Sequence, residues 1–279
     1  MCAFADWIGR TEKVEDFIAS APAVAAAATL EDAEAEFPDG AALPPLWHWF
    51  HFLPKAPQSR IGADGHPERG GFLPPIPLPR RMFAGARVRF FTPLVVGRPA
   101  VREGVIRSVS QKSGRSGTLA FVTVGYVIRQ DGRLCLEEEQ DIVYREPGAP
   151  VPAPVPLPSL PAPPQGAWTE TINPDPVLLF RFSALTFNGH RIHYDRPYAT
   201  GIEGYPGLVV HGPLTAMLLM QLVRRNAARP VQAFSFRGLA PLFDLAPFRL
   251  IGRPDGDTVA LEAQGPDGKA AMSAEADLG

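Results

Sequence analysis

Cysteine is almost absent from this chain. Only Cys2 and Cys135 occur, far apart and without the spacing of a metal site, which excludes a disulfide framework and favours a reducing compartment. Long apolar runs are lacking as well, because no stretch approaches the roughly 20 apolar residues that a membrane span requires. The first residues show no basic segment followed by an apolar core. We therefore expect no signal peptide, no membrane partner and a cytoplasmic location.

An excess of charge of one sign is also missing. The chain has 27 Lys and Arg against 29 Asp and Glu, a formal net charge of −2, so electrostatics give no reason to expect a nucleic-acid partner. Apolar residues make up 46% of the chain, which is enough for a globular protein with a real core. A length of 279 residues allows one large domain or two of ordinary size.

Proline, in contrast, is abundant and concentrated. Residues 147–165 hold nine prolines in nineteen positions. This composition stays extended and cannot build a core, so it indicates a linker. We expect an N-terminal unit at 1–146, a linker at 147–166 and a C-terminal unit at 167–279.

Residue patterns predict the elements on both sides of the linker. Before it we expect a helix up to about residue 33, an aromatic stretch, and strands at 87–91, 102–110, 118–129 and up to 144. After it we expect a short strand at 177–182, then a helix that opens at Gly212-Pro213 and runs to about Arg225. Further strands are expected at 232–239, 248–252, 258–263 and 270–278.

An internal repeat sets the expected architecture. FTPL at 91–94 recurs as LAPL at 239–242, and DGRLCLEEEQDI at 131–142 matches DGKAAMSAEADL at 267–278 without a gap. Two matches in the same order imply a duplicated antiparallel unit. The clear helix that leads into strands occurs only in the second copy. We therefore predict an α+β fold of the double hot-dog type, with curved sheets wrapped around a helix and the N-terminal unit altered.

Three of the six histidines gather in residues 187–219. His190, His193 and His211 lie there, and the stretch ends by opening the predicted helix at Gly212. Imidazoles titrate near neutral pH, and the first turn of a helix offers unpaired backbone N–H groups at the positive end of its dipole. The stretch therefore suggests proton transfer beside a polarised carbonyl.

Several short segments carry a family resemblance. The most specific is FSALTFNGHRIHYD at 182–195, and the supporting ones are PPLWHW at 44–49, GGFLPP at 70–75, PRRM at 79–82, EEQDI at 138–142 and HGP at 211–213. Together they resemble the MaoC-like enoyl-thioester hydratases and dehydratases. Within that family they are closest to the two-unit branch with the type 2 3-hydroxyacyl-thioester dehydratases and the mesaconyl-C4-CoA hydratases. The resemblance covers most of the chain.

The resemblance implies the site residues. In the family, a histidine follows an aspartate by five residues, and a backbone N–H at the helix start holds the thioester oxygen. His193 then matches the histidine as acid/base and Gly212 the oxyanion donor, while Asn188 stands at the aspartate position and could orient water or the carbonyl. Asparagine cannot take up a proton at neutral pH, so either His193 acts alone or another carboxylate joins it. Asp195 is the nearest candidate, although orienting an imidazole or capping a turn is its expected role.

The same resemblance suggests a substrate and the residues that would bind it. A dicarboxylic acyl group such as mesaconyl needs a cation for its free carboxylate, and Arg191, Arg80 and Arg81 are candidates. His190 and His211 complete the expected substrate-binding set. Three imidazole nitrogens could hold zinc, but the turn-rich segment and the metal-free family favour no metal.

We therefore predict a hydro-lyase that adds water to, or removes it from, a short enoyl-CoA thioester. The expected reaction converts mesaconyl-C4-CoA or itaconyl-CoA to citramalyl-CoA, with no cofactor beyond the coenzyme A of the acyl-CoA substrate. The alternatives are a 3-hydroxyacyl-thioester dehydratase of fatty-acid metabolism and a non-catalytic acyl-thioester-binding protein. A homodimer is expected from the resemblance.

Overall fold

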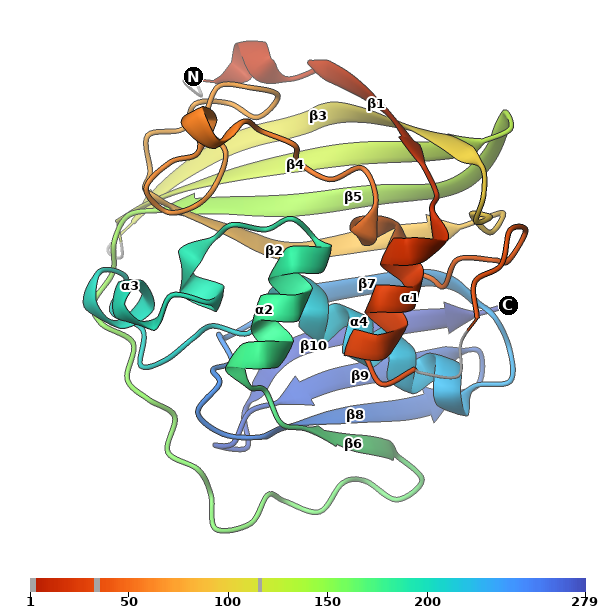
Figure 1. The fold of residues 1–279 in the computed structure, drawn as a ribbon. Coiled ribbons are helices and arrows are strands. Elements are labelled where there is room, and N and C mark those ends of the chain that lie inside the picture. The colour runs from red at the N-terminus through yellow and green to blue at the C-terminus, as the bar shows by residue number, and fades with distance from the viewer. Residues whose placement is uncertain (1–3, 33–35, 115–116) are drawn as a thin grey trace.

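One continuous antiparallel sheet of ten strands runs through the protein. The computed structural model describes residues 4–32, 36–114 and 117–279, and its strand order is β1-β3-β4-β5-β2-β7-β10-β9-β8-β6 (Figure 1). The N-terminal half supplies β1 (Thr11–Phe17), β2 (Arg80–Phe90), β3 (Pro99–Gly114), β4 (Gly117–Gln130) and β5 (Arg133–Arg145). The C-terminal half supplies β6 (Trp168–Ile172), β7 (Val231–Gly238), β8 (Phe248–Asp255), β9 (Thr258–Gln264) and β10 (Ala270–Leu278). The two halves join where β2 pairs with β7.

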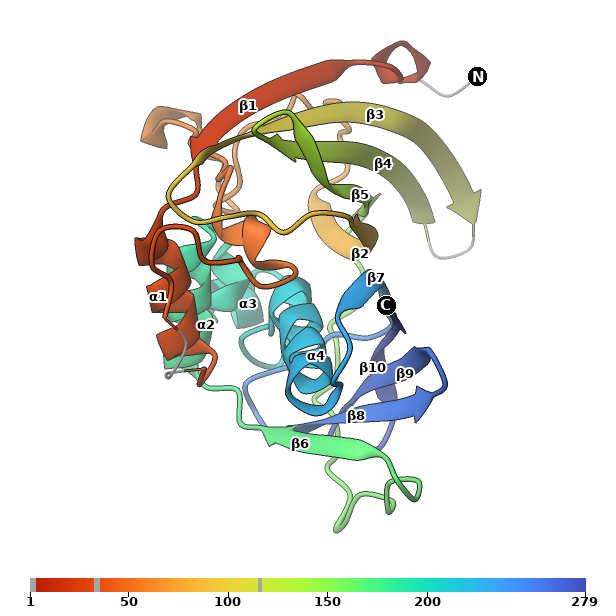
Figure 2. The same ribbon diagram turned by 90° about the vertical axis from the view of Figure 1, so that its right-hand side faces the viewer.

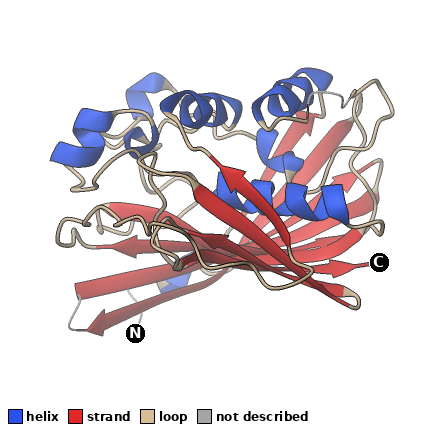
Figure 3. Cartoon of the chain, turned by 90° about the horizontal axis from the view of Figure 1, so that it is seen from below, coloured by secondary structure: helices blue, strands red, loops and turns tan. Residues whose placement is uncertain are grey.

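The helices gather on one side of this sheet (Figure 3). The α-helices on that side are α1 (Ser20–Thr29), α2 (Pro176–Leu185), α3 (Arg196–Gly201) and α4 (Gly212–Asn226). Short 3-10 turns lie elsewhere along the chain, at Ala5–Trp7, Trp47–Phe50, Gln58–Arg60 and Arg191–His193. α4 lies within the curve of the C-terminal strands, and α1 and α2 lie side by side beyond it (Figure 2). Every residue of α4 from Leu214 to Val223 is buried, as expected of a helix that is covered all round.

The predicted repeat is visible in the hydrogen bonds of the two halves. The matched Asp-Gly pairs form the turns between β4 and β5 and between β9 and β10. Just after β2, the Phe91 N–H donates to the Cys135 carbonyl at 2.9 Å, and just after β7, the Leu239 N–H donates to the Ala271 carbonyl at 2.8 Å. Phe91 aligns with Leu239, and Cys135 aligns with Ala271, when the two repeat segments are aligned with each other. The duplicated antiparallel unit is therefore present.

The two units differ where the central helix belongs. The Val210 N–H donates to the Leu242 carbonyl at 2.8 Å immediately before α4, and the Leu43 N–H donates to the Leu94 carbonyl at 2.7 Å in the equivalent place. After Leu43, however, the chain forms only two short 3-10 turns, Trp47–Phe50 and Gln58–Arg60, and is otherwise irregular up to β2. The α+β double hot-dog with an altered N-terminal unit is thus confirmed.

Two predicted elements are wrong. Thr11–Phe17, expected to be helical, is the edge strand β1, and its alternation of exposed and half-buried residues is the two-residue period of a strand. The predicted end of that helix at residue 33 lies outside the described residues. The expected strand at 177–182 is part of α2, which the Asp175 side chain caps by accepting from the Leu178 N–H at 2.8 Å. Asp followed by Pro at a helix start is a capping signal that outweighs the β-branched and aromatic residues behind it.

Residues 147–166 contain no helix or strand, although the division of the chain at that segment stays a prediction. Among the helices of the described ranges, none has the length and apolar character needed to cross a membrane.

Candidate active site

A cavity of about 610 Å³ lies beside the start of α4. The C-terminal half contributes Asn188, Gly189 and Pro213 to its wall. The N-terminal half contributes a larger share, including the aromatic and charged side chains of Trp49, Phe52, His66, Arg69, Arg81, Phe83 and Tyr144. The predicted motif therefore borders a real cavity, but both units build it.

The start of α4 is arranged to hold an oxygen. His211 is the residue before the first helical turn and Pro213 occupies that turn. The Gly212 N–H has no hydrogen-bond partner within the described parts of the chain. Such an N–H, at the positive end of the helix dipole, can stabilise a negative oxygen.

His193 is buried and held in one tautomer. Its Nδ1 lies 2.7 Å from the Val209 carbonyl oxygen, and because a carbonyl only accepts, Nδ1 carries the proton. Nε2 is then the basic atom. Burial lowers the pKa of His193 to about 4, so the ring is neutral at pH 7 and can accept a proton there.

His211 stacks on His193, with ring centres 3.6 Å apart. Its Nε2 lies 2.9 Å from the Ser183 hydroxyl oxygen, while its Nδ1 is buried and has no partner among the described residues. Burial also holds the pKa of His211 well below its ordinary value. A neutral ring packed in this way positions His193 and the beginning of α4.

Asn188 presents its amide to the cavity. Its Oδ1 accepts from the His190 N–H at 3.0 Å, which uses the oxygen inside the turn. The Nδ2 hydrogens have no partner within the residues the structure describes, so Asn188 can donate to a water or a carbonyl oxygen. The preceding Phe187 has a φ of 49°, a strained conformation of the kind found at functional sites.

The three arginines predicted to bind substrate have different surroundings. Arg191 is paired with Asp195 at 2.8 Å, and Arg80 is buried and paired with Glu203 at 2.8 Å. Arg81 lines the 610 Å³ cavity and an adjoining one of about 540 Å³. It has no acidic partner in the described ranges. Of the three, Arg81 has the guanidinium that is available to a ligand.

Asp195 performs the role expected of it. Its Oδ1 accepts from the Tyr198 N–H at 3.1 Å and so caps α3, while its Oδ2 pairs with Arg191. This carboxylate therefore serves the local turn, and the geometry gives no reason to assign it to proton transfer.

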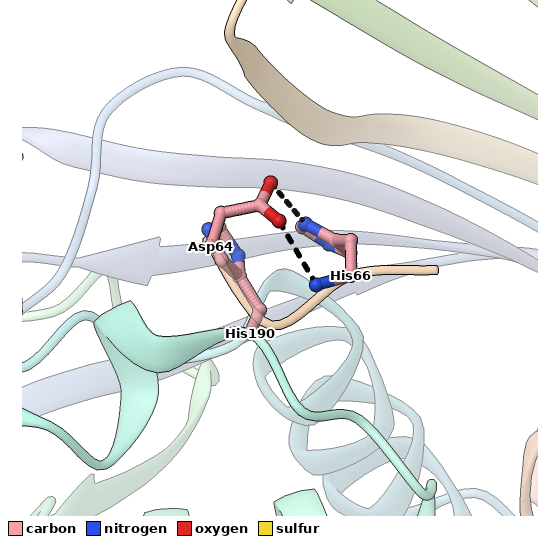
Figure 4. A group of neighbouring side chains, drawn as sticks. All are labelled: Asp64, His66 and His190. Atoms are coloured by element: carbon pink, nitrogen blue, oxygen red, sulfur yellow. Dashed lines mark hydrogen bonds and ion pairs between the residues drawn. The ribbon is translucent and has the colours of Figure 1, made fainter. Parts of the chain in front are cut away.

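Sequence reasoning missed Asp64 and His66. Asp64 Oδ2 lies 3.0 Å from His66 Nδ1, and the His66 N–H donates to Asp64 Oδ1 at 3.0 Å (Figure 4). The His66 ring packs on that of His190, with centres 4.1 Å apart. Ligand atoms of Asp64, His66 and His190 lie within 4.8 Å of one another, so these three side chains form one compact polar cluster. Only the short Asp-Gly-His sequence marks this pair, which lies more than 110 residues before the motif.

Comparison with known proteins identifies the family. A profile of the hydroxyacyl-thioester dehydratase type 2 family matches residues 46–244. The chain is 69% identical to the mesaconyl-C(4)-CoA hydratase of Chloroflexus aurantiacus over 98% of this chain and 97% of that protein. It is 30% identical to the mitochondrial hydroxyacyl-thioester dehydratase type 2 of Schizosaccharomyces pombe over 75% and 77%, respectively.

A solved structure supports the fold. A Mycobacterium tuberculosis protein described as having a double hotdog fold superposes with a TM-score of 0.58 at 14% identity, covering 97% of this chain and 96% of that one. At that identity the likeness concerns the fold alone. The profile match and the near-complete relative together show that this chain belongs to the hydroxyacyl-thioester dehydratase type 2 family.

Proposed function

We propose that this protein is a hydro-lyase that hydrates a short, carboxylated enoyl-CoA, namely mesaconyl-C4-CoA or itaconyl-CoA, to citramalyl-CoA. The observation that carries the proposal is the high identity to a mesaconyl-C(4)-CoA hydratase along almost the whole chain. The reaction needs no metal and no cofactor other than the coenzyme A of the substrate.

Hydration of a double bond conjugated to a thioester needs a base for water, a donor for the enolate oxygen and a proton for the α-carbon. His193 Nε2 is the proposed base, since Val209 holds the proton on the other nitrogen. The Gly212 N–H donates a hydrogen bond to the enolate oxygen, and a prearranged donor at this position lowers the activation barrier most. The Asn188 amide orients the water or the carbonyl. His190 and His211 surround the base and keep it in position.

The free carboxylate of the acyl group is assigned to Arg81. It lines the cavity without a carboxylate of its own among the described residues, and a guanidinium binds a carboxylate through two parallel hydrogen bonds. Arg80 and Arg191, which already hold Glu203 and Asp195, then support the surrounding loops.

The second candidate is dehydration of a plain 3-hydroxyacyl thioester, which the aromatic lining of Trp49, Phe52 and Phe83 favours. A non-catalytic acyl-thioester-binding protein remains the rival from another class, because Asn188 occupies the aspartate position. It predicts binding of coenzyme A esters without turnover.

The deciding experiment compares mesaconyl-C4-CoA, itaconyl-CoA and crotonyl-CoA as substrates of the wild type and of His193→Ala. Preference for a carboxylated ester, lost in the variant, would support the proposal. Preference for crotonyl-CoA would favour the second candidate, and binding without turnover would favour the third. Full activity of His193→Ala would refute the assignment of the base.

We also propose a cytoplasmic homodimer. The two edges of the sheet, β1 and β6, are the strands at which hot-dog sheets could pair. Light scattering after size exclusion would decide, since a dimer has twice the 30.2 kDa of one chain.

A further inference from the structure

We propose that His66, held by Asp64, is a second acid/base residue of the cavity and delivers the proton to the α-carbon of the substrate. This inference rests on the proposed hydro-lyase function. It assigns to the N-terminal unit a direct part in the chemistry.

The loop that carries His66 is fixed firmly on the motif. It closes on itself through the Gly62 N–H, which donates to the His66 carbonyl at 2.8 Å, and it is tied to the motif by the Arg191 N–H, which donates to the Asp64 carbonyl at 2.9 Å. At Gly65 the backbones touch so closely that a Cβ would lie 1.7 Å from the Gly189 carbonyl oxygen. The position of His66 relative to the motif is therefore determined by backbone contacts.

Asp64 fixes the tautomer of the neutral His66 ring and stabilises its protonated form. An ionised carboxylate only accepts hydrogen bonds, so His66 Nδ1 carries a proton and Nε2 is left to exchange one. Hydrogen bonds and charge from His66 lower the pKa of Asp64 against the opposing effect of burial, so this carboxylate is ionised. A carboxylate behind an imidazole holds the ring and stabilises the imidazolium form.

The cavity needs a second proton carrier, and His66 is placed to be one. Water addition removes one proton from the water that attacks the β-carbon and delivers one proton to the α-carbon, and Asn188 can do neither. Of the four clustered imidazoles, His66 is the one that lines the cavity. His190 packs against it and lies next to His193, with ring centres 4.1 and 5.3 Å apart, respectively.

The proposed steps balance. An O–H bond of water breaks as its proton passes to His193 Nε2, and the oxygen bonds to the β-carbon. The electron pair of the double bond moves into the thioester, whose enolate oxygen accepts from the Gly212 N–H. The enolate then collapses, and its α-carbon takes the proton from His66 Nε2. His193 ends with one proton more and His66 with one fewer, and the proton returns through His190 or solvent.

The hydrogen-bonded dyad accounts for the cluster better than a metal centre does. Two imidazoles that converge on one zinc ion keep their ring centres roughly 5 Å apart, because each nitrogen lies about 2 Å from the metal. The ring centres of His66 and His190 lie 4.1 Å apart, which is closer than that, and Asp64 is already hydrogen-bonded to His66.

The pH dependence gives a readout that a structural role would not produce. His66 must be protonated to act, so its pKa sets an alkaline limb, above which hydration slows. The groups that face His66 are Asp64 from its own loop, His190 from the motif, and Arg69 and Arg81. Burial and the two arginines lower the pKa of His66 below its ordinary value, and Asp64 opposes this shift without cancelling it. Asp64→Asn should therefore move the alkaline limb to lower pH.

The test compares the full-length wild type with His66→Gln, Asp64→Asn and the control Arg60→Gln. Arg60 lies in the same loop, forms an exposed ion pair with Glu68 and does not line the cavity. His66→Gln retains an N–H for Asp64 but cannot carry a proton, so kcat should fall about 100-fold or more with little change in KM. Its pH profile should lose the alkaline limb, and Arg60→Gln should match the wild type.

A second measurement tests proton transfer at the α-carbon separately from the addition of water. Wild type should exchange the α-protons of butyryl-CoA with deuterated water, and His66→Gln should not. Undiminished kcat or exchange in His66→Gln would overturn the proposal, as would an unmoved alkaline limb in Asp64→Asn or one tightly bound metal ion per chain. If His66→Gln does not fold, Asp64→Asn and its pH profile decide. If the wild type hydrates no ester at all, the proposed function fails and this inference fails with it.

Discussion

Replacing Gly65 by alanine should disable the candidate active site without changing any of its reacting groups. Gly65 has a φ of +89°, and a Cβ there would lie 1.7 Å from the Gly189 carbonyl oxygen and 2.6 Å from its carbon. Both partners are backbone atoms, so no side chain can rotate away. Either the loop that carries His66 or the turn that carries Asn188 must move.

The size of the effect follows from this geometry. An ordinary contact to a Cβ begins at about 3.4 Å, so the segments must separate by more than about 1 Å, and a misplacement of that size costs about 100-fold in rate. The backbone conformation adds about 1–3 kcal/mol of strain. We expect kcat to fall about 100-fold, with a loss of stability small enough for the protein to stay folded.

The assay is steady-state hydration of the best ester, with urea unfolding of the same samples. Gly71→Ala is the matched control, because a Cβ at Gly71 meets nothing within 4 Å. A Gly65→Ala variant with the kcat of the wild type would refute the idea that activity requires this close backbone contact between the two halves.

Three further predictions concern charge. Glu138→Ala should lower the free energy of unfolding by about 3–5 kcal/mol, because it breaks a buried pair with His48 at 3.0 Å, whereas Glu139→Ala at an exposed pair should cost about 1 kcal/mol or less. Burial alone would raise the pKa of Glu138, but His48 holds its carboxylate charged and the pKa is lowered from 4.5. The stabilisation by Glu138 should therefore be complete well above pH 4.5 and disappear on acidification. Urea unfolding measured over a range of pH can show this loss. Arg81→Gln should raise KM for a carboxylated ester about 10- to 100-fold and leave that for crotonyl-CoA unchanged, whereas Arg80→Gln should mainly lower the unfolding temperature.

Patterns along the chain were sufficient to predict the double hot-dog architecture, and they led to the site residues that are proposed in the C-terminal half. The duplicated Asp-Gly segments predicted two matching units, and the helix start at Gly212-Pro213 predicted which unit contains the central helix. These features are local or periodic, so they can be read without knowing which segments meet. Local signals were also enough for the capping role of Asp195.

The contribution of the N-terminal unit to the site depends on contacts that form only in the folded chain. Asp64 and His66 lie in an irregular segment with no periodicity, and their place beside His190 depends on a backbone contact across more than 120 residues. The availability of Arg81, in contrast to Arg80 and Arg191, is likewise a matter of which carboxylates lie nearby. Such pairings are set by the packing of distant segments, and no pattern along the chain encodes them.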